Sequence, residues 1–263
     1  MKRIGAWWMV LLLAAWLAGC VGVPGGGDRE IRTESDQSSA EKRARVRLEL
    51  ATAYFARGQS TTALDEVKQA LAAKPDLPEA YNLRGLIYAS LNEPNLAEQS
   101  FRHALQLNPR DGDTLHNYGW FACQQRRFDE AEAQFNAALA APQYTGASRT
   151  LTAHGICLAR AGRWPEAERQ LARAFELDPG NPAAAFAYSE VLYQRGEYER
   201  ARFYVRRMNA QPEQSNAQTL WLAARIERRL GNRPGLEDFA RQLRERFPDS
   251  AEARRLSLGQ FDD

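Results

Sequence analysis

The chain has 263 residues, of which 44% are hydrophobic and 26% are charged, a balance typical of a folded protein that excludes disorder over most of its length. Its formal net charge is only +2, and its three cysteines and three histidines are too few for a disulfide scaffold or a rich metal site. Packing between secondary-structure elements therefore has to supply the stability.

The first twenty residues have the pattern of a targeting signal. Lys2 and Arg3 are positively charged, the run Ile4–Ala18 is apolar, and Leu17–Cys20 is a stretch of small residues that ends in cysteine. The apolar run is shorter than the roughly 20 residues that a membrane-spanning helix needs. The pattern resembles a bacterial lipoprotein signal, which implies that residues 1–19 are removed and that Cys20 becomes acylated. An uncleaved anchor and an ordinary secretory signal are the alternatives.

Acylation at Cys20 would attach the protein to a membrane without a spanning helix. By resemblance to enterobacterial lipoproteins, Val21 in place of an aspartate implies sorting to the periplasmic face of the outer membrane. Cleavage removes two of the 35 basic side chains and leaves 33 against 33 acidic ones, so we expect no nucleic-acid partner. Residues 20–40, rich in Gly, Ser, Asp and Gln, read as a flexible tether.

A period near 34 residues runs through the rest of the chain. Pro75, Pro109, Pro179 and Pro248 each end a helical stretch, because proline cannot continue a helix. Residues 41–249 are therefore predicted to form six helix pairs, at about 44–77, 78–111, 112–147, 148–181, 182–216 and 217–249. Residues 250–263 are predicted to form a capping helix and tail, with Asp249 or Ser250 as the N-cap.

The spacing of these prolines and of the small residues between them resembles the tetratricopeptide repeat. In that repeat a pair of antiparallel helices stacks on the next pair. Glycine or alanine at the eighth place lets two backbones approach closely, and a large side chain at the twenty-fourth fills the space beside them. Repeats one, five and six have Ala51, Ser189 and Ala224 at the eighth place, which we expect to weaken those copies. The predicted fold is all-α, a right-handed superhelical solenoid of six repeats with a C-terminal capping helix.

The resemblance also implies a binding groove, because the first helices of such repeats line a concave face. The residues that fall at groove places in the N-terminal half are Leu48, Thr52, Phe55, Asn82, Leu86, His116 and Trp120. Apolar side chains with a few amides suit an apolar helix or extended peptide of a protein partner. The alternative is that they pack helix against helix. A second aromatic stretch, Phe186, Tyr193 and Trp221, accompanies Arg225, Arg228 and Arg229, for which a solvated helix face is the simpler interpretation.

No catalytic motif is found in the sequence. There is no glycine-rich phosphate loop and no Gly-x-Ser-x-Gly turn, and His103, His116 and His154 have no common spacing. Carboxylate pairs such as Glu130 and Glu132 lie two residues apart and point to different sides of a helix. We therefore predict a protein without catalytic residues, cofactor, metal or small-molecule substrate.

Cys123 and Cys157 lie 34 residues apart, one repeat, on the first helices of neighbouring repeats. The periplasm is oxidising, so we hypothesise a disulfide between repeats three and four. Two buried thiols are the alternative, because free cysteine is common in protein cores.

The lipobox, the tether and the six repeats together resemble the type IV pilus biogenesis/stability lipoproteins, the PilF/PilW pilotin family. The resemblance includes the closing phrase Leu243–Ser250. It implies a non-enzymatic role in which the protein binds secretin subunits and promotes their localisation and multimerisation in the outer membrane. One alternative is a repeat lipoprotein that presents a periplasmic protease or cell-wall enzyme to its substrates. The other is an enzyme of unrecognised type.

Overall fold

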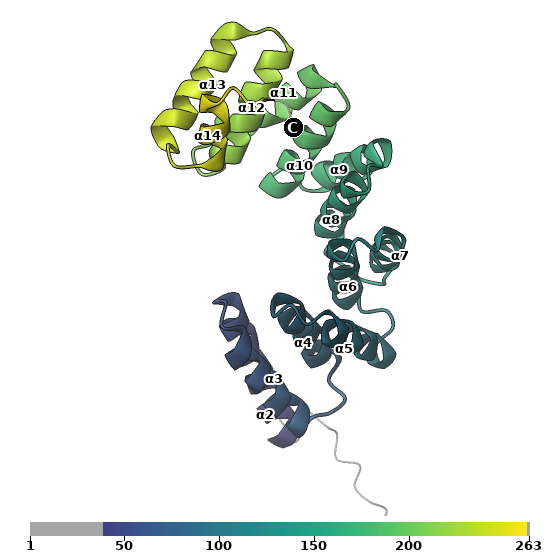
Figure 1. Cartoon of the computed structure of the whole chain (residues 1–263). Helices are drawn as coiled ribbons and strands as arrows, with labels where there is room; N and C mark the ends of the chain where they lie inside the picture. Colours follow the sequence, from purple (N-terminus) through teal and green to yellow (C-terminus); the bar gives the residue numbers. More distant parts are fainter. Residues whose placement is uncertain (1–38, 262–263) are drawn as a thin grey trace, which may run out of the picture. The chain divides into compact units, whose positions relative to one another are not determined.

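The computed structural model describes residues 39–261, and in this range it contains thirteen α-helices and no strand (Figure 1). The helices are α2 (Ser39–Ala56), α3 (Ser60–Ala73), α4 (Pro78–Ser90), α5 (Pro94–Leu107), α6 (Gly112–Gln124), α7 (Phe128–Leu139), α8 (Ala147–Arg160), α9 (Trp164–Leu177), α10 (Pro182–Gln194), α11 (Tyr198–Asn209), α12 (Ala217–Arg229), α13 (Arg233–Arg246) and α14 (Ala251–Ser257). The all-α prediction is confirmed. Helix α2 begins at Ser39 and so includes the last two residues of the predicted tether, and Cys20 lies outside the described residues.

The helices from α2 to α13 form six pairs, and we call the first helix of each pair the A helix and the second the B helix. From α4 to α13, each A helix contacts its own B helix, and each B helix from α3 to α11 also contacts the next A helix. Successive A helices from α4 to α12 contact one another as well. The short helix α14 packs on α12 and α13, and Ser250 caps it by accepting a hydrogen bond from the Ala253 N–H at 3.0 Å.

A small residue of each A helix is followed, sixteen positions later, by a residue of the B helix, and in the three couples that begin with glycine the B side chain lies directly against the glycine. The six couples are Ala51 and Val67, Gly85 and Phe101, Gly119 and Phe135, Gly155 and Leu171, Ser189 and Val205, and Ala224 and Ala240, and all twelve residues are buried. Where the A residue is glycine, the B residue is large, and where the A residue is larger, the B residue is valine or alanine. The two sizes therefore compensate each other.

The glycines of this contact have no space for a side chain. A Cβ added to Gly85 would lie 2.6 Å from the Phe101 ring, and one added to Gly119 would lie 2.9 Å from Phe135. Such distances are well inside van der Waals contact. We expected the Ala or Ser side chains to weaken repeats one, five and six. The smaller B residue in each of these repeats offsets that effect, because it leaves room for the Ala or Ser side chain.

The turn inside each pair contains one residue with a positive φ angle. These residues are Gly58, Asn92, Arg126, Gly162, Gly196 and Gly231. In each turn the next N–H donates back to a carbonyl five residues earlier, as Arg127 does to Ala122 at 2.9 Å, which closes the end of the A helix. A Cβ at Gly196 would meet no atom within 4 Å, so glycine is favoured there by backbone conformation and not by space.

We expect Arg126→Gly to stabilise the protein. Arg126 has φ +60, a conformation that costs an L-residue roughly 1–2 kcal/mol, whereas glycine adopts it freely. Its guanidinium lies 6.0 Å from the Phe128 ring, at the limit of a cation–π contact, so little is lost with it. The free energy of unfolding in urea should rise by about 1 kcal/mol.

Two matched variants control this experiment. Gly196→Ala should lower stability by about 1 kcal/mol, because it makes the reverse change at the equivalent turn. Arg173→Gly, at an exposed position inside α9, should also lower stability by about 1 kcal/mol. If Arg126→Gly destabilises the chain as much as Arg173→Gly does, the positive φ angle of Arg126 does not cost stability.

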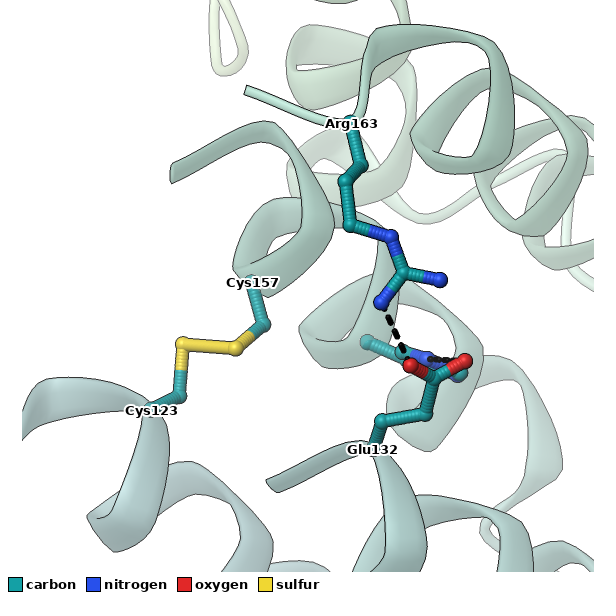
Figure 2. Close-up of a disulfide and its surroundings, with 5 residues drawn as sticks. Cys123, Glu132, Cys157 and Arg163 are labelled. Atoms are coloured by element: carbon teal, nitrogen blue, oxygen red, sulfur yellow. Dashed lines mark hydrogen bonds and ion pairs between the residues drawn. A yellow bond between two sulfur atoms is a disulfide. The ribbon is translucent and has the colours of Figure 1, made fainter. Parts of the chain in front are cut away.

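Helices α6 and α8 carry the two cysteines of the array, and their sulfurs are bonded in the structure (Figure 2). The Cα atoms of Cys123 and Cys157 are 5.8 Å apart, a separation common for disulfides, and both residues are buried. Close by, Arg163 forms an ion pair with Glu132 at 2.5 Å (Figure 2). The disulfide therefore joins two successive A helices covalently.

We predict that the mature protein contains this disulfide and that it contributes about 3–4 kcal/mol to stability, the value expected for a loop of this size. In denaturant, thiol titration should find two more thiols after reduction than before. Reduction should also lower the urea midpoint, and should leave the midpoint of a Cys123→Ser/Cys157→Ser variant unchanged. Equal thiol counts with and without reductant would contradict the prediction.

Candidate functional site on the A helices

Three of the seven predicted groove residues lie on α2. Leu48 and Phe55 are half-buried and pack on a core cluster that contains Ala51 of the same helix and Val67 of α3. Thr52 is exposed, and its hydroxyl donates to the Leu48 carbonyl at 2.9 Å. Leu48 and Phe55 therefore support the first repeat with one side of the side chain and keep the other side accessible.

Two more lie on α4. Asn82 is half-buried, and its amide oxygen accepts a hydrogen bond from Asn117 of α6 at 3.1 Å. Leu86 is half-buried against a cluster that includes Phe101 and Phe121. The Asn82 amide is thus used to join successive A helices, which leaves its NH2 group as the part that could meet a partner.

His116 of α6 lies inside the array. Its side chain is only 8% exposed, and Nδ1 lies 2.9 Å from the Thr150 hydroxyl of α8. Burial lowers the pKa of His116 to about 4, and the Arg149 charge acts in the same direction. The imidazole is therefore neutral at pH 7, and its role is to connect α6 to α8 and not to line an open face.

Trp120, one turn after His116, is half-buried. The guanidinium of Arg160, from the end of α8, lies 4.9 Å from the centre of its ring, within the range of a cation–π contact. Cys123 follows on the same helix, so the disulfide and the Trp120–Arg160 contact both join α6 to α8. Trp120 consequently presents a fixed aromatic surface.

Two cavities lie further along the array. One, of about 310 Å³, lies between α8, α9 and α10 and is lined by Ile156, Ala159, Arg160, Trp164, Leu171, Ala187, Glu190, Val191 and Gln194. Its lower part is apolar, whereas Arg160 and Glu190 are exposed at the rim with opposite charges. A cavity of this size and lining suits a bulky apolar side chain with little charge preference.

A second cavity, of about 290 Å³, lies between α10, α12 and α14. Its lining comprises Phe186, Glu190, Gln218, Trp221, Leu222, Arg225, Glu252 and Arg255. Glu190 of α10 contributes to both cavities. Together they extend the candidate binding surface from the N-terminal A helices to the end of the array.

The arginines of the second aromatic stretch pack more closely than a solvated face would. Arg225 is buried, and its guanidinium lies 4.4 Å from the centre of the Tyr193 ring. The Tyr193 hydroxyl in turn accepts a hydrogen bond from Arg229 Nε at 3.4 Å. Arg225 therefore supports the stacking of α12 on α10, while Arg228 and Arg229 remain exposed.

The carboxylate pairs of the sequence serve as ion pairs between B helices and turns. Arg163 bonds both Glu132 and Glu166, which raises the pKa of Arg163 and lowers that of Glu166. His154, whose pKa is lowered by burial, lies 3.8 Å from Glu132. Within residues 39–261 no group of acidic, His and Cys residues could hold a metal ion, and no helix there is long and apolar enough to span a bilayer.

Sequence reasoning did not predict the cavity between α8, α9 and α10. Ile156 falls at a groove place, but Trp164 begins a B helix and Leu171 belongs to the core contact with Gly155. The signal that could have found it is Trp164, the aromatic that opens the B helix after the Gly162 turn; repeats three and five have Phe128 and Tyr198 at this place. The cavity needs the contact between successive pairs, which one sequence does not specify.

Comparison with known proteins agrees with this architecture. Tetratricopeptide repeat families match residues 78–111, 100–133 and 158–226, and a TPR repeat family matches residues 51–92. The type IV pilus assembly protein PilF of Pseudomonas aeruginosa is 27% identical over 244 residues, which are 93% of this chain and 94% of that protein.

Two solved structures extend the comparison to the fold. A crystal structure of PilW, described as a widely conserved type IV pilus biogenesis factor, has a TM-score of 0.76 at 29% identity, covering 81% of this chain and 97% of that chain. A structure of Pseudomonas aeruginosa PilF has a TM-score of 0.74 at 25% identity, covering 84% and 99%. This chain is therefore a tetratricopeptide repeat protein homologous to the type IV pilus biogenesis factors PilF and PilW.

Proposed function

We propose that this protein is a pilotin, an outer-membrane lipoprotein that binds secretin subunits and promotes their localisation and multimerisation for type IV pilus biogenesis. The protein would have no catalytic step of its own. Its partner would be the secretin of the pilus machinery, and its contact with the membrane would be the acylated Cys20 on the periplasmic face.

The observation that supports this proposal is the extent of the PilF match. Repeat proteins of unrelated function commonly share a few repeats, because each repeat satisfies the same packing rules. Here the similarity covers nearly the full length of both chains, and at 244 residues it is longer than the helical array from Ser39 to Phe261. A shared fold alone would not require similarity outside the repeats.

The A-helix face supplies groups suited to a secretin segment. Phe55 and Trp120 are half-buried, so each can add apolar contact without losing its support from the array. The exposed Thr52 and the NH2 group of Asn82 can satisfy polar groups of a bound backbone. Acyl chains at Cys20 would hold the bound subunits at one membrane, where their higher effective concentration favours ring assembly.

The test is deletion of the gene followed by complementation. We expect deletion to reduce secretin multimers in blots of outer-membrane fractions and to abolish twitching. Wild type should restore both. Cys20→Ser should leave the protein without acyl chains and restore multimers poorly, because the acylation site is gone.

Phe55→Glu and Trp120→Glu test the face itself, and each should lower the yield of multimers because a charge at an apolar contact is costly to bury. Leu96→Glu is the matched control, since Leu96 is an exposed leucine of a B helix. All variants should keep wild-type helical content by circular dichroism. Unchanged multimers and motility in the deletion strain would refute the pilotin assignment, and wild-type yields in both face variants would place the contact elsewhere.

A further inference from the structure

The C-terminal tail folds back onto the last A helix. After α14 the chain continues without secondary structure, and the Phe261 ring lies 5.1 Å, centre to centre, from the Trp221 ring of α12. The guanidinium of Arg228, seven residues further along the same helix, lies 4.3 Å from the centre of the Phe261 ring. The aromatic side chain of this segment thus contacts both an indole and a cation, and aromatic rings favour both contacts.

The tail sits beside an open cavity. Trp221 also lines the space between α10, α12 and α14, together with Phe186 and Leu222 on its apolar side. The indole Nε1–H of Trp221 is buried, and no acceptor for it is found among the described residues. A buried donor without a partner is costly, so a backbone carbonyl that reached Nε1 would be favoured there.

The tail is held mainly through the Phe261 ring, which packs on the core cluster that contains Trp221 and Leu222. Apart from the ring contacts, its backbone bonds are local, from Gln260 N–H to the Arg255 carbonyl at 2.9 Å and from Phe261 N–H to the Gly259 carbonyl at 3.1 Å. Phe261 is also only half-buried. A segment with more contacts could therefore replace it.

We propose that Trp221, Arg228 and the adjoining cavity form a second peptide-binding site, which Phe261 of the chain's own tail occupies until an aromatic side chain of a partner protein displaces it. The partner segment would place a backbone carbonyl near Trp221 Nε1. The cavity lining balances Arg225 and Arg255 against Glu190 and Glu252, so the apolar ring and not a net charge would select the occupant. This proposal does not depend on the identity of the partner at the N-terminal A helices.

The test observes the indole N–H signals of the full chain without its leader. Three tryptophans remain in it, Trp120, Trp164 and Trp221, and single Trp→Phe variants assign their ¹H–¹⁵N signals. Phe261→Ser should shift the Trp221 signal and leave the other two in place. Phe203→Ser is the matched control, because Phe203 is a phenylalanine with 62% of its surface exposed on α11, and it should leave the Trp221 signal unchanged.

An acetylated peptide with the sequence Leu-Gly-Gln-Phe-Asp-Asp, residues 258–263, then serves as the probe. Added to the Phe261→Ser variant, it should return the Trp221 signal towards its wild-type position, and the same peptide with Ala for Phe should not. Wild type should bind the peptide at least about tenfold more weakly than Phe261→Ser does. If Phe261 of the tail occupies the site about nine-tenths of the time, the apparent affinity for the peptide falls by that factor. Phe261→Ser/Arg228→Gln should bind it more weakly than Phe261→Ser.

Three results would overturn the proposal. The Trp221 signal could be the same in wild type and Phe261→Ser, which would mean that the tail does not occupy the site. The Phe and Ala peptides could bind alike, which would mean that the site does not recognise a ring. Wild type and Phe261→Ser could bind the Phe peptide equally, which would mean that the tail does not compete.

Discussion

The closeness of the two helices within each pair is the constraint on which the rest of the array depends. Gly85, Gly119 and Gly155 have no room for a Cβ, because the side chain sixteen residues later fills that space. In the other three pairs the A residue is Ala or Ser, and the B residue is reduced to valine or alanine. This close packing within the pairs lets one pair stack on the next, and the A helices from α4 to α12 contact each other in sequence.

Contacts between pairs then add specificity to this spacing. Asn82 bonds Asn117, and His116 bonds Thr150, so polar side chains join successive A helices at buried or half-buried places. The Cys123–Cys157 bond does the same covalently. These groups are used between helices, whereas Leu48, Phe55, Leu86 and Trp120 on the A helices are half-buried aromatic and aliphatic residues. This division of roles accounts for an A-helix face that is apolar without being part of the core.

The helix pairs could be predicted from the sequence, because each depends on residues less than one period apart. The compensation in size within a pair was missed, because the eighth-place residue was considered without the residue sixteen positions later. For His116 the sequence left a groove place and packing between helices open, because its cover comes from Thr150, beyond the irregular turn that contains Tyr144. The cavity near Trp164 depends on contacts between repeats. The contact of Phe261 with Trp221 depends on the path of the tail. No periodic pattern reports such contacts.

A double-mutant cycle at Gly119 and Phe135 tests the central claim most directly. In the wild-type background, Gly119→Ala should lower the free energy of unfolding by about 1–3 kcal/mol, because the new methyl group collides with the ring. In a Phe135→Val background, which copies the Ala51 and Val67 couple of the first repeat, the same change should be neutral or stabilising. If Gly119→Ala instead stabilises both backgrounds by about 1 kcal/mol, as helix propensity alone predicts, close approach does not determine the packing of this array.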